Sequence, residues 1–336
     1  MVAPRALMVI SATRDAPQFS VAEAKKSLGG ARPVFDLHKV SKNIRHAIFE
    51  SPHAYNQPMR EAMYGWMTLH LKGEGDGSPI PEPGIKPEDP ETIRCFPGDT
   101  RPDDWLTLPQ FASLEAKRIL KEFPAPENNK AWTDRKELNR LRLTIVTRHP
   151  LLYPKTPPPI LEPSPGQTPQ VLHLKSEPGL DASLQHDPGD PDRIAVLLDV
   201  KGHKKVAPHK LATELRKAGW TVYTLDLRAT GETAHPRDKI GRAADHNTAE
   251  WSLLTGRALI WQWMWDVRAF LDAADIQKAT LIGNGPAGVA ALCSAAQDKR
   301  ISQAAAIDSL ASFVSDVPYE NQRLGIIVPG MLRELG

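Results

Sequence analysis

The first part of the chain alternates between short apolar runs and segments with helical spacing. Residues 5–11 are rich in strand-forming side chains and end at a loop with a proline, which predicts a buried strand. Ser20 opens a Ser-x-x-Glu capping pattern, so a helix is expected over residues 21–28. A second strand is expected over residues 45–49, and a helix over residues 58–71 whose apolar face packs on a sheet.

Prolines and charged residues dominate the next part of the chain. Residues 73–109 show no periodic pattern, and a polar helix is expected over residues 110–123. A further helix and a short strand are expected over residues 135–147. Eleven prolines between positions 150 and 191 predict that regular structure is absent over most of that stretch. Residues 73–190 are therefore interpreted as a linker or an extended wrapping segment.

From about residue 191 onward, apolar segments of strand length alternate with segments of helical length. The first of these strands is almost continuously apolar, as expected of a strand that is buried on both faces. Such alternation predicts an α/β fold, in which helices cover both faces of a mostly parallel sheet. The expected strands are 194–199, 221–226, 279–282 and 302–307, and the expected helices are 208–218, 249–275 and 287–297.

Composition narrows the classes of partner. The chain has 336 residues, a formal net charge of +2 and 24% charged residues, which gives no broad field for nucleic acid or a membrane surface. Cys95 and Cys293 have no companions at metal spacing, so neither a zinc site nor a disulfide framework is expected. No apolar stretch approaches about 18 residues, and the start lacks a signal-peptide pattern. As given, the chain is expected to be cytoplasmic, with small molecules as partners.

A glycine turn after the strand at 279–282 carries the candidate chemistry. Read as a nucleophile elbow, Gly-x-Ser-x-Gly, it places Gly283 and Ala287 at the outer positions and Gly285 where the nucleophile belongs. Read as Gly-x-Gly-x-x-Gly, it uses Gly283, Gly285 and Gly288 to seat a pyrophosphate on a helix N-terminus. A third interpretation is purely structural, because glycines at such junctions also serve the turn and close packing.

The dinucleotide interpretation has one further feature in its favour. Asp308 stands 20 residues beyond Gly288 at the end of an expected strand, where an acid would bind a ribose. Against it, the fingerprint normally opens its domain, whereas here two strands and a long helix precede the turn. Only 48 residues follow Gly288, too few for the rest of a flavoprotein. We therefore expect no cofactor and no metal, and keep FAD or NAD binding as an alternative.

The surroundings of the turn resemble a known family. The runs Asp-Leu-Arg-Ala-Thr-Gly-Glu at 226–232, His-Asn-Thr-Ala-Glu-Trp at 246–251 and Trp-Asp-Val-Arg at 265–268 resemble α/β-hydrolases related to acetyl xylan esterases and cephalosporin deacetylases. Residues 318–336 look like the segment that follows the elbow in those proteins. The resemblance implies an α/β-hydrolase-like, mostly parallel sheet with helices on both faces. The prolines predict, in addition, a long irregular segment. Asp226 and Arg228 are expected to brace their loop.

The start of the chain resembles the end of the same fold. Residues 7–17 look like the strand and loop that deliver the catalytic acid, which makes Asp15 the candidate. Residues 51–56 look like the histidine loop, which makes His53 the candidate. In this family a serine attacks the ester, a histidine accepts its proton and a carboxylate orients the imidazole. Glycine has no attacking atom, so the nucleophile is missing at Gly285.

Two architectures follow from the resemblance. In the favoured one, residues 1–72 are the closing part of an α/β-hydrolase domain whose serine lies upstream, and residues 191–336 are the opening part of a second, degenerate one. In the other, residues 1–72 complete the second sheet as in a circular permutant. The favoured architecture implies a partial carbohydrate-esterase-like hydrolase, inactive as this chain, that acts in the complete protein on a small acyl ester or acetylated carbohydrate together with the missing hydrolase portions. The permuted architecture implies one whole α/β-hydrolase fold that binds without turnover, because Gly285 supplies no nucleophile. A non-catalytic binding or scaffold domain is the other alternative.

Overall fold

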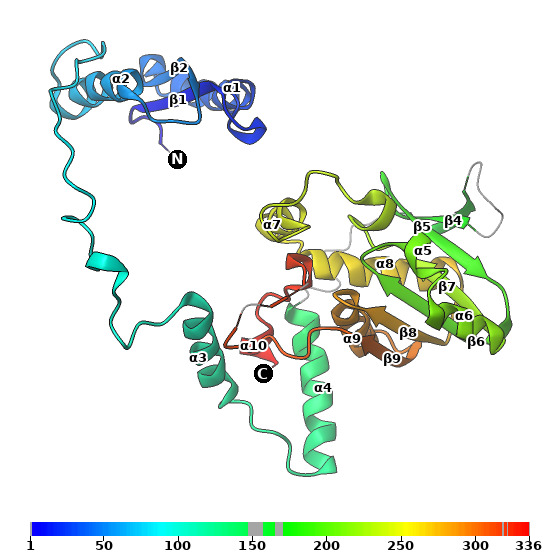
Figure 1. Ribbon diagram of the computed structural model, residues 1–336. Coiled ribbons are helices and arrows are strands. Elements are labelled where there is room, and N and C mark those ends of the chain that lie inside the picture. The colour runs from blue at the N-terminus through cyan, green and yellow to red at the C-terminus, as the bar shows by residue number, and fades with distance from the viewer. Residues whose placement is uncertain (1, 147–156, 165–170, 318, 321, 336) are drawn as a thin grey trace. The chain divides into compact units, whose positions relative to one another are not determined.

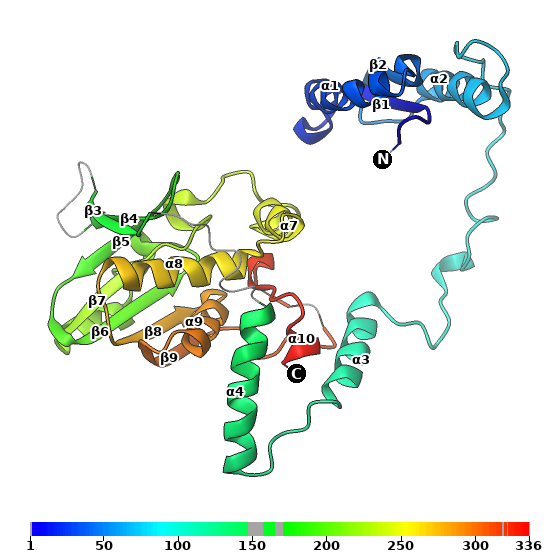
Figure 2. The ribbon, with the colours of Figure 1, turned by 180° about the vertical axis from the view of Figure 1, so that it is seen from behind.

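The chain divides into two compact units, Met1–Asp103 and Asp104–Gly336. The computed structural model, shown in Figure 1 and from behind in Figure 2, describes residues 2–146, 157–164, 171–317, 319–320 and 322–335. Among these residues, none of the helices has the length and apolar character needed to cross a bilayer.

The first unit is a small α/β layer built on two strands. β1 (Leu7–Arg14) and β2 (Ile44–Pro52) pair in parallel, and α1 (Val21–Leu37) connects them. α2 (Gln57–Met67) follows β2 and continues into a π-helical turn, Thr68–Lys72. The expected strands and helices are therefore present, and α1 is longer than the helix expected over residues 21–28. The short 3-10 turns of this unit are Pro17–Phe19, Ser41–Asn43 and Pro97–Asp99.

Helices cover both faces of this strand pair. Ile44 of β2 is buried with Leu28 and Phe35 of α1. Its neighbour Arg45 points to the opposite face, because side chains alternate along a strand. There its guanidinium group lies 4.6 Å from the centre of the ring of Trp66 in α2. The carboxyl ends of the two strands, and the loops that follow them, thus lie at one edge of the strand pair. α1 packs on one face of this pair and α2 on the other.

The second unit is built on a seven-stranded sheet, whose strands run in the order β3-β4-β5-β7-β6-β8-β9. β6 to β9 are mutually parallel where they pair, and β5 is antiparallel to both of its neighbours. This mostly parallel sheet confirms the predicted α/β class. The strands are β3 (Ile160–Pro163), β4 (Val171–Glu177), β5 (Leu180–Asp187), β6 (Asp190–Asp199), β7 (Trp220–Leu225), β8 (Ala279–Asn284) and β9 (Ile301–Ile307).

Three of these strands correct the interpretation of residues 73–190 as irregular. β3, β4 and β5 all lie in that segment, among the prolines. The prolines stand where strands end: Pro163 is the last residue of edge strand β3, Pro178 lies in the β4–β5 turn, and Pro188 lies between β5 and β6. Proline is tolerated at such positions because no ladder hydrogen bond is lost there. The positions of the prolines, more than their number, therefore decide where strands can form.

Two helical predictions also need correction. The helix expected over residues 249–275 is divided into α7 (His246–Leu254) and α8 (Leu259–Ala273), and Gly256 between them has a φ of +71°. The helix and short strand expected over residues 135–147 form one helix, α4, up to Val146, and residue 147 lies outside the described residues. The other helices are α3 (Leu108–Leu120), α4 (Asn129–Val146), α5 (His203–Val206), α6 (Lys210–Lys217), α9 (Ala287–Gln297) and α10 (Met331–Glu334), and 3-10 turns lie at Gly231–Thr233 and Leu324–Ile326.

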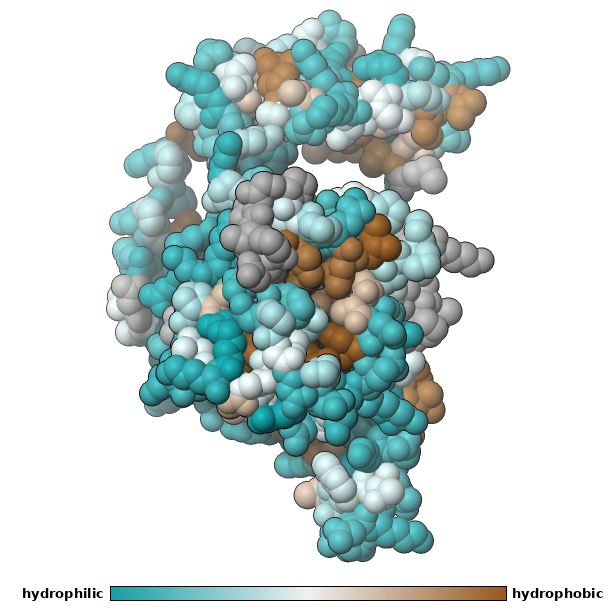
Figure 3. Space-filling view, turned by 90° about the vertical axis from the view of Figure 1, so that its right-hand side faces the viewer, coloured by the Kyte–Doolittle hydropathy of each residue, from teal (hydrophilic) through white to brown (hydrophobic). Residues whose placement is uncertain are grey.

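The core of this unit lies on both faces of the sheet. The larger cluster packs α8 and α9 against one face and includes Trp263 and Phe270, both fully buried. The smaller cluster lies beneath α5 and α6 on the other face and includes Leu197 and Ile282. Figure 3 shows a mostly hydrophilic surface on which hydrophobic residues gather in patches.

One edge of the sheet is formed by β9. Ile301, its first residue, is buried, whereas residues 302–307 are all exposed. β9 pairs in parallel with β8, and among the described residues no further strand lies beyond it in the sheet. The carboxyl ends of β6, β8 and β9 lie side by side at the edge where the glycine turn is found.

Candidate functional site

Asp15 and His53 meet at the carboxyl edge of the first unit. Asp15 follows β1 and His53 follows β2, so the parallel pairing brings their loops together. His53 Nδ1 lies 2.9 Å from Asp15 Oδ1 and 3.0 Å from Oδ2. The His53 side chain is 78% exposed and the Asp15 side chain only 10% exposed. The structure thus brings together the two residues that the sequence singled out as acid and base.

The environment of Asp15 favours its charged form. The hydrogen bond with His53 lowers the pKa of the Asp15 carboxyl below its ordinary value, and a second hydrogen bond from the Ala16 amide acts in the same direction. An ionised carboxylate that accepts the Nδ1 proton holds the imidazole in the tautomer whose Nε2 is free to accept a proton. The centre of the Phe19 ring lies 5.9 Å from that of the imidazole, with the two ring planes tilted by 35°.

The lowered pKa of Asp15 has a consequence that is open to measurement. In the folded chain the carboxyl is expected to titrate below the ordinary aspartate value of about 4. Its contribution to stability is therefore present above that value, and is lost as pH falls through the lower folded pKa. In His53→Ala the pKa should rise toward the ordinary value, as followed by carboxyl ¹³C NMR titration. An unchanged Asp15 titration in that variant would show that His53 is not the cause.

The glycine turn in the second unit links β8 to α9, and its three glycines are explained by two different constraints. A Cβ on Gly283 would lie 2.4 Å from the Ala287 carbonyl oxygen, and one on Gly288 would lie 2.5 Å from Ser309 Oγ. Both positions therefore serve the close packing of α9. Gly285 has a φ of +55°, and a Cβ there would meet no atom within 4 Å. The position that the elbow interpretation assigns to the nucleophile is thus open, but it holds no side chain.

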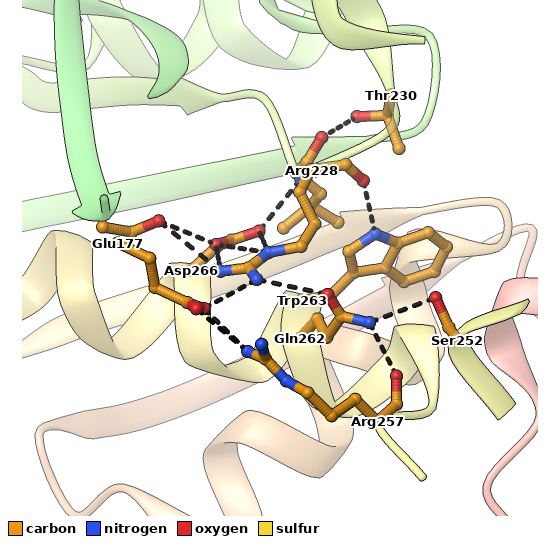
Figure 4. Close-up of polar contacts among 10 residues, drawn as sticks. Glu177, Arg228, Thr230, Ser252, Arg257, Gln262, Trp263 and Asp266 are labelled. Atoms are coloured by element: carbon orange, nitrogen blue, oxygen red, sulfur yellow. Dashed lines mark hydrogen bonds and ion pairs between the residues drawn. The ribbon is translucent and has the colours of Figure 1, made fainter. Parts of the chain in front are cut away.

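A buried ion-pair network holds the loop after β7, as Figure 4 shows. The Arg228 guanidinium group binds Asp266 of α8, with Nη2 2.5 Å from Oδ1, and Nη1 lies 2.8 Å from Glu177 Oε1. Arg257 contacts the same Glu177 carboxylate at 2.9 Å. Burial alone would lower the pKa of Arg228, but the charges of Asp266 and Glu177 raise it above its ordinary value. Arg228 is therefore a charged brace, as expected from the sequence.

Asp226, the other expected brace, accepts hydrogen bonds from residues of two loops. Its Oδ1 accepts from the backbone amide and the Nδ1 of buried His203, and its Oδ2 accepts from the Glu232 amide. These carboxylate and imidazole groups are close enough to surround a metal ion. However, both Asp226 oxygens already bind backbone amides, and Lys204 binds the Glu232 carboxylate. The cluster is therefore better explained as a support for the two loops.

Comparison with known proteins gives matches among solved structures alone, since no protein-family model and no curated protein matches the sequence. A putative acetyl xylan esterase from Bacteroides fragilis superposes with a TM-score of 0.52 at 11% identity. The match covers 70% of this chain and 72% of that one. The chain has an α/β-hydrolase fold.

Other solved α/β-hydrolase structures match smaller parts of the chain. A probable hydrolytic enzyme from Pseudomonas aeruginosa has a TM-score of 0.30 at 13% identity, covering 46% of this chain and 42% of that one. A serine hydrolase from Cycloclasticus has a TM-score of 0.29 at 17% identity, covering 42% of this chain and 45% of that one. The chain thus spans less than half the length of each of these two proteins.

If the glycine turn is interpreted as a nucleophile elbow, it lacks a backbone donor as well as the serine. In this fold the backbone amide of the residue after the nucleophile helps to hold the oxyanion. That residue is Pro286, and proline has no N–H group. The amide of Gly285 is also engaged, since it donates to the Ile307 carbonyl oxygen at 2.8 Å. The proline was visible in the sequence, but its effect on the oxyanion site was missed.

The missing N–H group of Pro286 and the engaged amide of Gly285 also weaken the dinucleotide alternative. A pyrophosphate at this turn would need the N–H groups of the loop and the first helical turn. Pro286 offers none, and the Gly285 amide is engaged as described above. Asp308 follows β9 and is exposed, so it lies beside the turn as that alternative requires. The turn itself nevertheless offers a pyrophosphate fewer donors than its glycine spacing implies.

Proposed function

We propose that this chain carries parts of a serine ester hydrolase related to acetyl xylan esterases. In this proposal Asp15 is the acid and His53 is the base, and the degenerate elbow of the second unit does not catalyse. The observation that carries the proposal is the pair of His53–Asp15 contacts at 2.9 and 3.0 Å, made from loops that follow two adjacent parallel strands. The fold shared with a putative acetyl xylan esterase supports an acetyl ester as the substrate class.

In the proposed reaction, His53 acts on a serine that the elbow at Gly285 does not supply. Nε2 of His53 accepts the proton of the serine hydroxyl as its oxygen attacks the ester carbonyl, and later returns that proton to the leaving alcohol. Asp15 remains ionised and stabilises the imidazolium that forms in between. The serine would come from another portion of the complete protein. The substrate would be a small acyl ester or an acetylated carbohydrate.

The proposed domain organisation keeps the favoured architecture. Residues 1–72 would be the closing portion of one hydrolase domain, with β1 and β2 as the strands that deliver the acid and the histidine. Residues 191–336 would be the opening portion of a second domain. The sheet of that portion also includes β3, β4 and β5, so its beginning lies upstream of residue 191.

The state of the His53 ring tests the catalytic assignment directly. In the full chain labelled with ¹⁵N-histidine, neutral His53 is expected to carry its proton on Nδ1, because the Asp15 carboxylate accepts it. Asp15→Asn should shift the population toward the Nε2–H form, since a neutral amide no longer favours one tautomer strongly. The resonances of the exposed His38 serve as an internal control. Neutral His53 protonated on Nε2 in the unmodified chain would contradict its role as the base.

The glycine turn of the second unit is proposed to be non-catalytic because Gly285 supplies no nucleophile and Pro286 supplies no oxyanion N–H group. Gly285→Ser is therefore expected to give no hydrolysis of acetylated xylan above that of the unmodified chain, since Pro286 still offers no amide. Released acetate is the measurement. Gly285→Ala controls for the effect of a side chain at this position. Turnover in Gly285→Ser that is abolished by adding His53→Ala would contradict the proposal and favour the permuted architecture.

A further inference from the structure

A small cavity lies at the carboxyl edge of the second unit, where β6 and β8 are neighbours. The chain leaves β6 toward β7 on one side and leaves β8 toward β9 on the other. In open α/β sheets, ligands bind in the crevice outside the carboxyl ends of the strands at such a reversal of strand order. The cavity has a volume of about 120 Å³ and is lined by residues of β6, β8 and β9 and of the segment around α5.

The floor of the cavity is formed by two rows of side chains from the sheet. Asp199, Asn284 and Ile307 are in register at the ends of β6, β8 and β9, and Leu197 and Ile282 form the row below. Residues in register on parallel strands point to the same face. Asn284 Nδ2 donates to Asp199 Oδ2 at 2.6 Å, and the Lys201 amide donates to Oδ1 at 2.8 Å. The single carboxylate of the floor is thus already bonded, and the rest is largely apolar.

The wall of the cavity is basic. Lys201, Lys205 and His209 line it from the loop after β6 and from the segment around α5. Among the described residues, neither Lys201 nor Lys205 forms an ion pair, whereas Lys204 between them binds Glu232. Two unpaired ammonium groups beside one bonded carboxylate attract an anion. Because the charges stand on the wall and the apolar groups on the floor, the site suits a ligand with one charged and one apolar end.

We propose that this cavity binds a short-chain carboxylate, such as acetate or propionate. The carboxylate group would lie near Lys201 and Lys205, and the apolar end would contact Ile282 and Ile307. The cavity volume of about 120 Å³ is well above the roughly 10–15 Å³ that one water needs, which suits an acid of a few carbon atoms. A purely inorganic anion would leave oxygens unpaired against the apolar floor, which is unfavourable. The site lies wholly in the second unit, so it does not depend on the roles of Asp15 and His53.

Titration of the full ¹⁵N-labelled chain tests this binding. At constant ionic strength, acetate and propionate are expected to produce saturable shifts of the Asn284 side-chain amide and the Gly285 backbone amide. The expected dissociation constant is about 1 mM, within the limit for a ligand of so few atoms. Acetamide, the neutral isostere, should leave both signals in place, and inorganic phosphate should bind more weakly than propionate.

Two sets of variants test whether the lysines of the cavity wall are needed for propionate binding. Lys201→Gln combined with Lys205→Gln is expected to weaken propionate binding by about tenfold or more. Lys204→Gln, a matched exposed lysine in the same segment, should leave it unchanged. Equal shifts with acetamide and acetate, unchanged binding by the double variant, or tighter binding of phosphate than of propionate would each overturn the proposal.

Discussion

Asp266→Asn is expected to lower the free energy of unfolding by about 3–5 kcal/mol, the usual effect of breaking a buried ion pair by removing one partner. The substitution keeps the shape of the side chain but removes the charge that faces Arg228, whose side chain is only 9% exposed. Glu177 would then be the one carboxylate left beside the Arg228 and Arg257 guanidinium groups. Urea unfolding followed by circular dichroism measures the change.

The matched control for this result lies on the same helix. Asp272 pairs with Arg300, but its side chain is 38% exposed, so water screens the interaction. Asp272→Asn should therefore change the free energy of unfolding by less than about 1 kcal/mol. Similar effects of the two substitutions would show that burial of the Arg228 network does not matter for stability.

Gly283→Ala is expected to destabilise the second unit by about 3 kcal/mol or more, as overpacking against a rigid neighbour does. The added Cβ would lie 2.4 Å from the Ala287 carbonyl oxygen and 2.6 Å from the Gly288 Cα. Both atoms belong to the backbone, so no flexible side chain is there to move away. α9 would have to shift away from β8, and its buried face packs on the sheet. Thermal and urea unfolding would both report the loss.

Gly285→Ala separates this clash from conformational strain. Its added Cβ meets open space, and the cost arises from the positive φ of +55° alone. That strain amounts to about 1–2 kcal/mol for a residue in the left-handed region. If Gly285→Ala were as destabilising as Gly283→Ala, the close approach of α9 to β8 would not explain why position 283 needs a glycine.

The parallel half of the second sheet was predictable because its signal is local. The strands expected at 194–199, 221–226, 279–282 and 302–307 correspond to β6, β7, β8 and β9 within a few residues. β3, β4 and β5 were missed because strand formation there depends on antiparallel pairing with other segments, which no local pattern reveals. Their polar and proline-rich flanks resembled a linker. The break between α7 and α8 coincides with a single glycine, Gly256, in a segment that otherwise has helical spacing.

In the candidate site, too, the contacts set by a local pattern could be predicted from the sequence, whereas contacts between distant segments could not. The pairing of Asp15 with His53 could be expected from a strand–helix–strand pattern, because parallel strands end at one edge. The Arg228 network could not, since Glu177 and Asp266 are 51 and 38 residues away in sequence and meet Arg228 once the sheet and α8 are formed. Pro286 is an intermediate case. The residue is visible in the sequence, but the consequence of its missing N–H group depends on its position in the turn after β8.

The exposed border strand β9 also affects how this chain behaves in concentrated solution. Residues 302–307 read Ser-Gln-Ala-Ala-Ala-Ile, without a lysine, a glutamate or a proline to discourage an incoming strand. Natural proteins usually protect such borders, because free amide and carbonyl groups recruit neighbouring molecules into a continuing sheet. Oligomers that grow with protein concentration would therefore join through β9, and a single lysine in place of Ala305 would suppress them.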